Sequence, residues 1–274
     1  MAKGERDRLA IRKMYKLFIN GAFVRSESGR SDPMWNGREF GANIARGSRK
    51  DVRDAVVAAR AAHGKWKSAA PGNRGLVLYR LAEMMEARRS EFVELTDDAG
   101  EVDAAIDRVV WYAGWADKFS ALLSTRNPVG GPHFNFSTAE PTGVVALLAP
   151  DEPGLLGLVS MILPAIVSGN AVVIVASEKE PRTAMVFAEA VATSDLPAGV
   201  VNIITGLRGE LAPVMAKHMD VNAMGFPANE LTAQLQELGA ENVKRMRVVD
   251  PSVQSLDEIA AYCEIKTIWH PAGV

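Results

Sequence analysis

The sequence predicts an α/β fold in which a parallel sheet is flanked by helices. Three short apolar runs, at residues 144–148, 172–175 and 200–204, have the length and composition of buried strands. Two stretches with helical spacing, at residues 154–167 and 182–193, separate them. Short buried strands that alternate with helices are typical of βαβ units, in which the strands run parallel.

A β-hairpin and then a helix are predicted near the N-terminus. Residues 17–24 hold two short apolar runs around Asn20-Gly21, a pair preferred in two-residue hairpin turns. Residues 51–67 place apolar side chains at helical spacing. Asp51 favours the start of this helix because its charge complements the helix dipole.

Two further helices are predicted before the parallel sheet. The first follows a break at residues 71–73 and runs on toward Leu95, with Leu76 on its apolar face. The second covers residues 103–123 and carries an aromatic stripe, which favours core packing over a cofactor site. The stripe consists of Trp111, Tyr112, Trp115 and Phe119.

Less regular segments surround the parallel unit. Residues 125–132 are rich in proline, glycine and asparagine, which predicts a loop. Residues 134–138 alternate like an exposed strand, and residues 243–249 are expected to form the last strand of the parallel sheet.

Length, charge and cysteine content exclude several classes of protein. The 274 residues allow one large domain or two modest ones. With 31 Lys and Arg against 33 Asp and Glu, the net charge of −2 argues against binding to nucleic acid or to an anionic membrane. Cys263 is the single cysteine, so no intrachain disulfide can form, and a cytoplasmic location is expected.

One uncharged segment is long enough to be considered as a membrane span. Residues 154–176 carry no charged side chain, but Pro164 interrupts them and Ser168-Gly169-Asn170 has the composition of a turn. The segment therefore predicts a buried helix, a turn and a buried strand. The charged N-terminus lacks the apolar region of a secretory signal, so we expect neither export nor a membrane anchor.

Ligands of parallel α/β sheets bind at the carboxyl ends of the strands. These ends are expected near residues 149–152, 176–178, 205–209 and 226–229. Neither G-x-G-x-x-G nor G-x-x-x-x-G-K-[ST] occurs in the chain, so no standard phosphate loop is predicted. The four histidines lie far apart in the sequence without metal-ligand spacing, and no metal site is expected.

Four segments carry a set of motifs in a fixed order. Residues 141–150 read PTGVVALLAP, residues 164–170 read PAIVSGN, residues 196–206 read LPAGVVNIITG, and residues 262–269 read YCEIKTIW. They resemble the aldehyde dehydrogenase superfamily, whose pattern is P-x-G-V-V…P-W-N-F-P, P-A-L-A-x-G-N, L-P-P-G-V-x-N-V-V-T-G and finally Y-T-x-V-K-T-V-W.

The resemblance implies a Rossmann-like sheet of the aldehyde dehydrogenase cofactor-domain type and a small antiparallel oligomerisation sheet. It places a dinucleotide-binding-like domain at residues 1–127 and 143–250. The oligomerisation hairpin and the closing strand would lie at residues 128–142 and 258–274.

Departures from the family pattern fall on the catalytic positions. Glu152 aligns with the oxyanion asparagine, and an ionised carboxylate offers no hydrogen-bond donor to a developing negative charge. Val249 aligns with the general-base glutamate. The domain with the G-Q-x-C nucleophile motif is absent between Asp250 and the closing strand. Cys263 lies in that strand, outside the motif, and is interpreted as a packed small hydrophobe.

The cofactor positions are altered as well. Glu178, Gly206 and Phe226 stand where the family contacts NAD or NADP. Val175 replaces the cofactor-binding lysine, and residues 226–229 read FPAN in place of F-T-G-S, without the glycine that permits close approach. We therefore expect binding of NAD or NADP that is weakened relative to the family.

The leading functional hypothesis is a catalytically inactive homologue that acts as a structural or regulatory subunit. It would form a homo-oligomer, or a hetero-oligomer with a full-length aldehyde dehydrogenase, through exposed strand edges. One alternative is an NAD(P)-dependent aldehyde oxidoreductase with a rearranged site, in which Cys263 would be the nucleophile. The other is a non-catalytic nucleotide-binding module.

Overall fold

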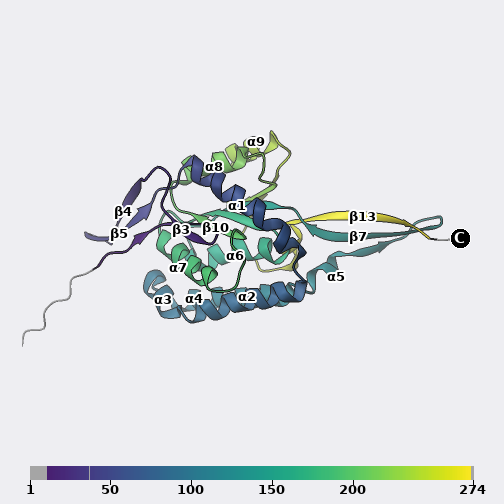
Figure 1. The fold of residues 1–274 in the computed structure, drawn as a ribbon, viewed down its shortest axis with the longest axis horizontal. Coiled ribbons are helices and arrows are strands. Elements are labelled where there is room, and N and C mark those ends of the chain that lie inside the picture. Colours follow the sequence, from purple (N-terminus) through teal and green to yellow (C-terminus); the bar gives the residue numbers. More distant parts are fainter. Residues whose placement is uncertain (1–10, 37, 273–274) are drawn as a thin grey trace, which may run out of the picture.

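The computed structural model describes residues 11–36 and 38–272 (Figure 1). A seven-stranded sheet of order β12-β11-β8-β9-β10-β2-β3 forms the centre of the molecule. Five strands are parallel: β8 (Val144–Leu148), β9 (Ala171–Val175), β10 (Val201–Ile204), β11 (Ala223–Phe226) and β12 (Arg245–Val248). The predicted α/β class with a parallel sheet is confirmed.

The N-terminal hairpin extends this sheet on one edge. It consists of β2 (Leu17–Ile19) and β3 (Ala22–Val24), and β2 is antiparallel to β10. The turn residues Asn20 and Gly21 both have positive φ, at 53° and 74°, as the predicted two-residue turn requires. The Asn20 amide donates to the side chain of Asn202 on β10 at 2.9 Å, which joins the turn to the parallel unit.

Helices cover both faces of the sheet (Figure 1). On one face lie α1 (Arg49–Ser68), α8 (Arg208–Lys217) and α9 (Thr232–Ala240). On the other lie α6 (Gly154–Val167) and α7 (Pro181–Ala192), with α2 (Pro71–Glu86), α3 (Arg89–Thr96) and α4 (Ala99–Trp115) packed outside them. The side chains of β8 alternate between the two faces. Val144 and Ala146 pack in the core beneath α1, and Val145 and Leu147 pack in the core beneath α6.

Helix α1 begins where its sequence favours a start. The Ser48 side chain accepts from the Asp51 amide, and the Asp51 carboxylate accepts from the Ser48 amide at 2.7 Å. This capping box pairs two amides that the helix itself leaves without partners. The Asp51 carboxylate also accepts from Ser26 at 2.8 Å, so the helix start is fixed to the preceding loop.

The two helices predicted over residues 76–95 and 103–123 are each divided in the structure. The first becomes α2 (Pro71–Glu86) and α3 (Arg89–Thr96), and the turn between them brings Phe92 into the core. Leu76 is 70% exposed, so its predicted core position is wrong. It lies two residues from the buried Leu78, which on a helix is about 200° around the axis. The second becomes α4 (Ala99–Trp115) and α5 (Phe119–Leu123).

A long antiparallel ribbon extends away from the body (Figure 1). Its strands are β6 (Thr125–Asn127), β7 (His133–Pro141) and β13 (Cys263–Pro271), in the order β13-β7-β6. The loop expected at residues 125–132 is therefore partly wrong, because residues 125–127 pair with β7. Because Arg126 and Asn127 are polar, this short segment lacks the apolar residues that would predict a strand.

A second three-stranded sheet was not expected from the sequence. It consists of β1 (Met14–Tyr15), β4 (Ser31–Asn36) and β5 (Glu39–Ala45), in the order β1-β5-β4. It matters for the site because β4 and β5 reach the carboxyl-end edge of the parallel strands, as described below.

The segment between β12 and β13 is short and tightly held. It contains α10 (Leu256–Ala260), and its loop is bonded by Arg108 of α4. The Arg108 guanidinium donates to the carbonyl oxygens of Pro251 at 2.7 Å and Ser252 at 3.2 Å. It also bonds the Gln254 side chain at 3.1 Å, so one buried cation fixes the whole loop.

The apolar segment at residues 154–176 forms α6, a turn and β9, as predicted. Within the described part of the chain, every helix is too short or too polar to cross a membrane.

Candidate functional site

The loops after β8, β9 and β10 meet at the carboxyl-end edge of the parallel sheet. Chain order along the sheet reverses at β8, because β9 and β10 lie on one side of it and β11 and β12 on the other. This is the place where open α/β sheets bind ligands. The strand ends predicted near residues 149–152, 176–178 and 205–209 all contribute to it.

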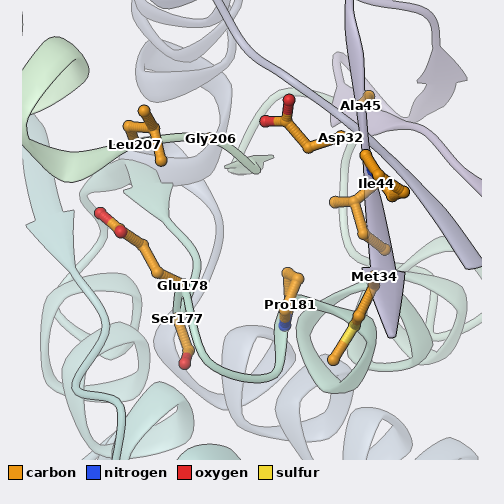
Figure 2. Close-up of a pocket in the computed structure, with 10 residues that line it drawn as sticks. Asp32, Met34, Ile44, Ala45, Ser177, Glu178, Pro181, Gly206 and Leu207 are labelled. Atoms are coloured by element: carbon orange, nitrogen blue, oxygen red, sulfur yellow. The ribbon is translucent and has the colours of Figure 1, made fainter. Parts of the chain in front are cut away.

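Two predicted site residues line one cavity at this edge. Glu178 and Gly206 belong to a cavity of about 190 Å³ whose other walls come from β4, β5 and the start of α7. Figure 2 shows the carboxyl groups of Glu178 and Asp32 on different walls of this cavity. Pockets that hold drug-sized ligands usually measure about 300–1,000 Å³, so the enclosed space is small.

Gly206 brings its loop close to the chain that precedes α1. Its φ of 144° is a conformation that other residues rarely adopt. A Cβ at this position would lie 3.0 Å from the Gly47 amide nitrogen and 3.1 Å from a methyl group of Leu211. The glycine is therefore required for packing, independently of any ligand.

Asp151 is the centre of the hydrogen-bond network at this edge. One carboxylate oxygen accepts from Ser177 Oγ at 2.7 Å and from the Glu178 amide at 3.0 Å. The Arg208 guanidinium donates to both carboxylate oxygens, at 2.6 and 3.0 Å. Burial of Asp151 works to raise its pKa, but the bonds from Ser177 and Arg208 outweigh it, and its pKa falls below the ordinary value.

Glu178 completes the network from the loop after β9. Its carboxylate accepts from the Arg208 backbone amide, at the start of α8, at 2.5 Å. Arg208 therefore bonds the loop after β8 with its side chain and the loop after β9 with its amide. A neighbouring crevice of about 380 Å³ is lined by both residues and by Asp151, Glu210 and Glu230.

Glu152 lies beside this network but points into solvent. Its side chain is 74% exposed and pairs with Lys179, which raises the pKa of that lysine. The two residues line a second, wider cavity together with Asp98 and Glu101. A solvated carboxylate with a lysine partner presents no hydrogen-bond donor of its own to a bound substrate.

Val249 and Phe226 lie at the carboxyl ends of β12 and β11. Both side chains are buried, Val249 at 5% exposure and Phe226 at 0%. The Val249 amide donates to the Phe226 carbonyl at 2.9 Å, which continues the ladder between the two strands. Their side chains belong to the core, and neither belongs to the cavity that Glu178 and Gly206 share.

Cys263 is separated from these residues, at the start of β13. It is 4% exposed and its thiol contacts the Ile259 carbonyl at 3.4 Å. Burial raises the pKa of the thiol to about 11, so very little thiolate is present near neutral pH. The structure thus brings Glu178 and Gly206 together and leaves Cys263 outside their cavity.

Metal ligands do not converge among residues 11–36 and 38–272. No group of three or more His, Cys, Asp or Glu side chains in these ranges could hold a metal ion.

Sequence reasoning missed the residues that dominate this edge. Neither Asp151 nor Arg208 is among the site residues predicted from the sequence. The sequence shows only that Asp151 and Arg208 come after β8 and β10, the parallel strands on either side of β9. Side chains that follow parallel strands lie at the same edge of the sheet, but strand order alone does not show which of them pair.

Comparison with known proteins places this architecture in a family. The aldehyde dehydrogenase family model matches residues 26–249. An aldehyde dehydrogenase of Enchytraeus buchholzi is 33% identical over 249 residues, which are 84% of this chain and 49% of the relative. The cytosolic aldehyde dehydrogenase 1 of Elephantulus edwardii is 32% identical over 248 residues, with the same coverage of 84% and 49%.

Solved structures give the same result. The NAD⁺ complex of an aldehyde dehydrogenase from Bacillus cereus aligns with a TM-score of 0.80 at 25% identity, over 85% of this chain and 50% of that one. An NAD-dependent aldehyde dehydrogenase from Sinorhizobium meliloti aligns with a TM-score of 0.81 at 27% identity, over 86% and 50%. The chain spans about half the length of the curated relatives it matches, and it belongs to the aldehyde dehydrogenase family.

Proposed function

We propose that this chain is a catalytically inactive member of the aldehyde dehydrogenase family that acts as a structural or regulatory subunit in the cytoplasm. The observation that carries the proposal is the position of its only thiol. Cys263 is buried at the start of β13, outside the cavity that Glu178 and Gly206 share, and its pKa is about 11. A thiol needs a lowered pKa or an adjacent base to act as a nucleophile.

The other catalytic positions support the same proposal. Glu152 replaces the family's oxyanion donor with an exposed carboxylate. Val249 replaces the general base with a buried apolar side chain. Nucleophile, oxyanion donor and base would each have to be supplied by unrelated groups for aldehyde oxidation to proceed.

The antiparallel ribbon is the proposed assembly surface. Strand β13 pairs only with β7 among the described strands, so its outer edge presents backbone groups that another chain can bond. Three large apolar side chains of the ribbon are exposed: Phe134 at 42%, Ile265 at 58% and Trp269 at 61%. We propose that this surface binds a second copy of the chain or a full-length aldehyde dehydrogenase.

Two alternatives follow from the family. An NAD(P)-dependent oxidoreductase with a rearranged site would require Cys263 to become exposed and ionised. A nucleotide-binding module would use Glu178 and Gly206, with the backbone near Phe226, and it draws support from the NAD⁺ complex of the similar Bacillus cereus enzyme. We propose that any binding of NAD or NADP is weakened, and that no metal takes part.

The assembly proposal is tested by the mass of the purified chain in solution. Size-exclusion chromatography with light scattering should give at least a dimer, and Ile265→Lys with Trp269→Ala should shift it toward monomer. Leu76→Lys is a matched control, because Leu76 is 70% exposed on α2, away from the ribbon. A monomer at all concentrations, with no partner co-purified from the native source, would contradict the proposal.

A further inference from the structure

A dinucleotide binds to this kind of sheet edge through free hydrogen-bond donors. Backbone amides at the start of the helices that follow the strands normally bond the phosphates, and the positive end of each helix dipole favours the negative charge. In this chain those helices are α6, α7, α8 and α9. Whether their amides are free decides whether the edge fits NAD or NADP.

The chain's own side chains already bond one or two amides at each of these helix starts. Glu101 of α4 accepts from the amides of Leu155 and Leu156, at 2.6 and 3.0 Å, in the first turn of α6. Glu178 does the same for Arg208 at the start of α8. The remaining caps are Glu180, which accepts from the Arg182 amide of α7 at 3.2 Å, and Asn229, which accepts from the Leu231 amide before α9 at 2.9 Å.

The ion pair of Asp151 and Arg208 joins the loop after β8 to the start of α8 at this edge of the sheet. Both carboxylate oxygens bond the guanidinium, and the Arg208 side chain is only 15% exposed. Asp151 also takes the loop donors Ser177 Oγ and the Glu178 amide, which an incoming phosphate would otherwise use. Figure 2 shows the Glu178 carboxyl pointing toward the loop of Gly206 and Leu207, where it reaches the start of α8.

The charges that line the crevice also oppose an anionic ligand. Asp151, Glu178, Glu210 and Glu230 face one cation, Arg208, which Asp151 already neutralises. Glu210 is paired outward, with Arg46 at 2.5 Å. A diphosphate placed here would meet carboxylates in a partly buried setting, where like charges repel strongly.

We infer that the ion pair Asp151–Arg208, with Glu178 bonded to the start of α8, acts as an internal latch at the dinucleotide crevice that weakens the binding of NAD and NADP. The residues present do not fit the cofactor that the family implies. This latch rests on the proposed function and gives a cause for the weakened cofactor binding. Carboxylates of the chain accept the hydrogen bonds that the phosphates of the cofactor would otherwise receive.

Isothermal titration with NAD⁺ tests the latch. The wild-type chain should bind more weakly than about 1 mM, and the variant Asp151→Asn with Arg208→Ala should bind at least about tenfold more tightly. The asparagine keeps an oxygen acceptor for Ser177 and the Glu178 amide. Arg60→Ala is the control, because Arg60 is also ion-paired, with Asp220 at 2.8 Å, but this pair lies before β11, at the opposite edge of the sheet. It should leave the affinity unchanged.

Micromolar binding by the wild type, or no gain in the double variant, would overturn the latch. Circular dichroism establishes that each variant is folded, and Asp151→Asn alone, which removes a carboxylate and leaves Arg208 free for a phosphate, replaces the double variant if that one unfolds. Failure here is distinguishable from failure of the proposed function. The titration measures nucleotide binding alone, whereas an inactive subunit is refuted by turnover of an aldehyde, whatever the affinity for NAD⁺.

Discussion

At the scale of single residues, the environment of Cys263 decides how the chain's only thiol behaves. Cys263 is the first residue of β13, and its thiol contacts the Ile259 carbonyl of α10. Burial stabilises the neutral form of this thiol. The folded pKa of about 11 exceeds the ordinary value of 9.0. The neutral thiol therefore stabilises the fold fully below about pH 9, and this contribution is lost as the pH rises through 11.

We expect Cys263 to react slowly with alkylating reagents in the native protein. At pH 8, a shift of the pKa from 9.0 to about 11 lowers the thiolate fraction about a hundredfold, and burial slows the reaction further. The rate of reaction with iodoacetamide, followed by mass spectrometry, should be at least about a hundred times lower than in urea-unfolded protein. Equal rates in the two states would show that the thiol is accessible and ionised.

The site was predictable from the sequence only in part, again for reasons that lie in single residues. Glu178 and Gly206 share a cavity because they follow neighbouring strands, and motif spacing placed both there. Phe226 follows the same rule, but its side chain turns into the core. Asp151 and Arg208 could not be paired in advance, because their pairing depends on the direction of two side chains that motif spacing does not give.

At the scale of elements, the loop between β12 and α10 depends on one buried cation. Arg108 is 9% exposed and its guanidinium has no carboxylate partner within bonding distance among the described residues. Its bonds go to carbonyl oxygens, the Gln254 side chain and the Ser160 hydroxyl. Burial lowers the pKa of Arg108, yet guanidinium groups stay charged in proteins.

We expect Arg108→Met to destabilise the fold by about 1–3 kcal/mol, because it removes the charge-assisted hydrogen bonds to the Pro251 and Ser252 carbonyl oxygens. Urea unfolding followed by circular dichroism measures the difference. Arg89→Met is the control, since it removes the exposed pair of Arg89 and Asp103 and should hardly move the midpoint. A loss in Arg108→Met no larger than in Arg89→Met would mean that the loop is held by its apolar contacts alone.

Elements with one strong periodicity were predictable, and those with mixed signals were not. The strands β8 and β9 are apolar throughout, and β10 is apolar except for Asn202, because both faces of these strands are covered, and their sequences show this directly. Strand β12 at the sheet edge is half-exposed, so its sequence carries a weaker signal. Strand β6 is polar and gains its strand partner only from β7, which local sequence cannot indicate.

At the scale of the whole molecule, the chain is a parallel α/β unit with an attached antiparallel ribbon. The positions that the family resemblance assigns to the oxyanion donor and the general base hold an exposed carboxylate, Glu152, and a buried valine, Val249, and the buried thiol of Cys263 lies outside the nucleophile motif. The ribbon, in contrast, keeps a long register of nine pairs between β7 and β13. The proposal of an inactive subunit rests on this ribbon, as the proposed assembly surface, together with these substitutions at the expected catalytic positions.

The most direct test of this account is aldehyde-dependent formation of NADH or NADPH by the folded, purified chain. Absorbance at 340 nm should show no increase above a protein-free blank, with aliphatic and aromatic aldehydes and with either cofactor in excess. A steady rate that scales with protein concentration and disappears in Cys263→Ser would contradict the account, because it would show that the buried thiol becomes a working nucleophile.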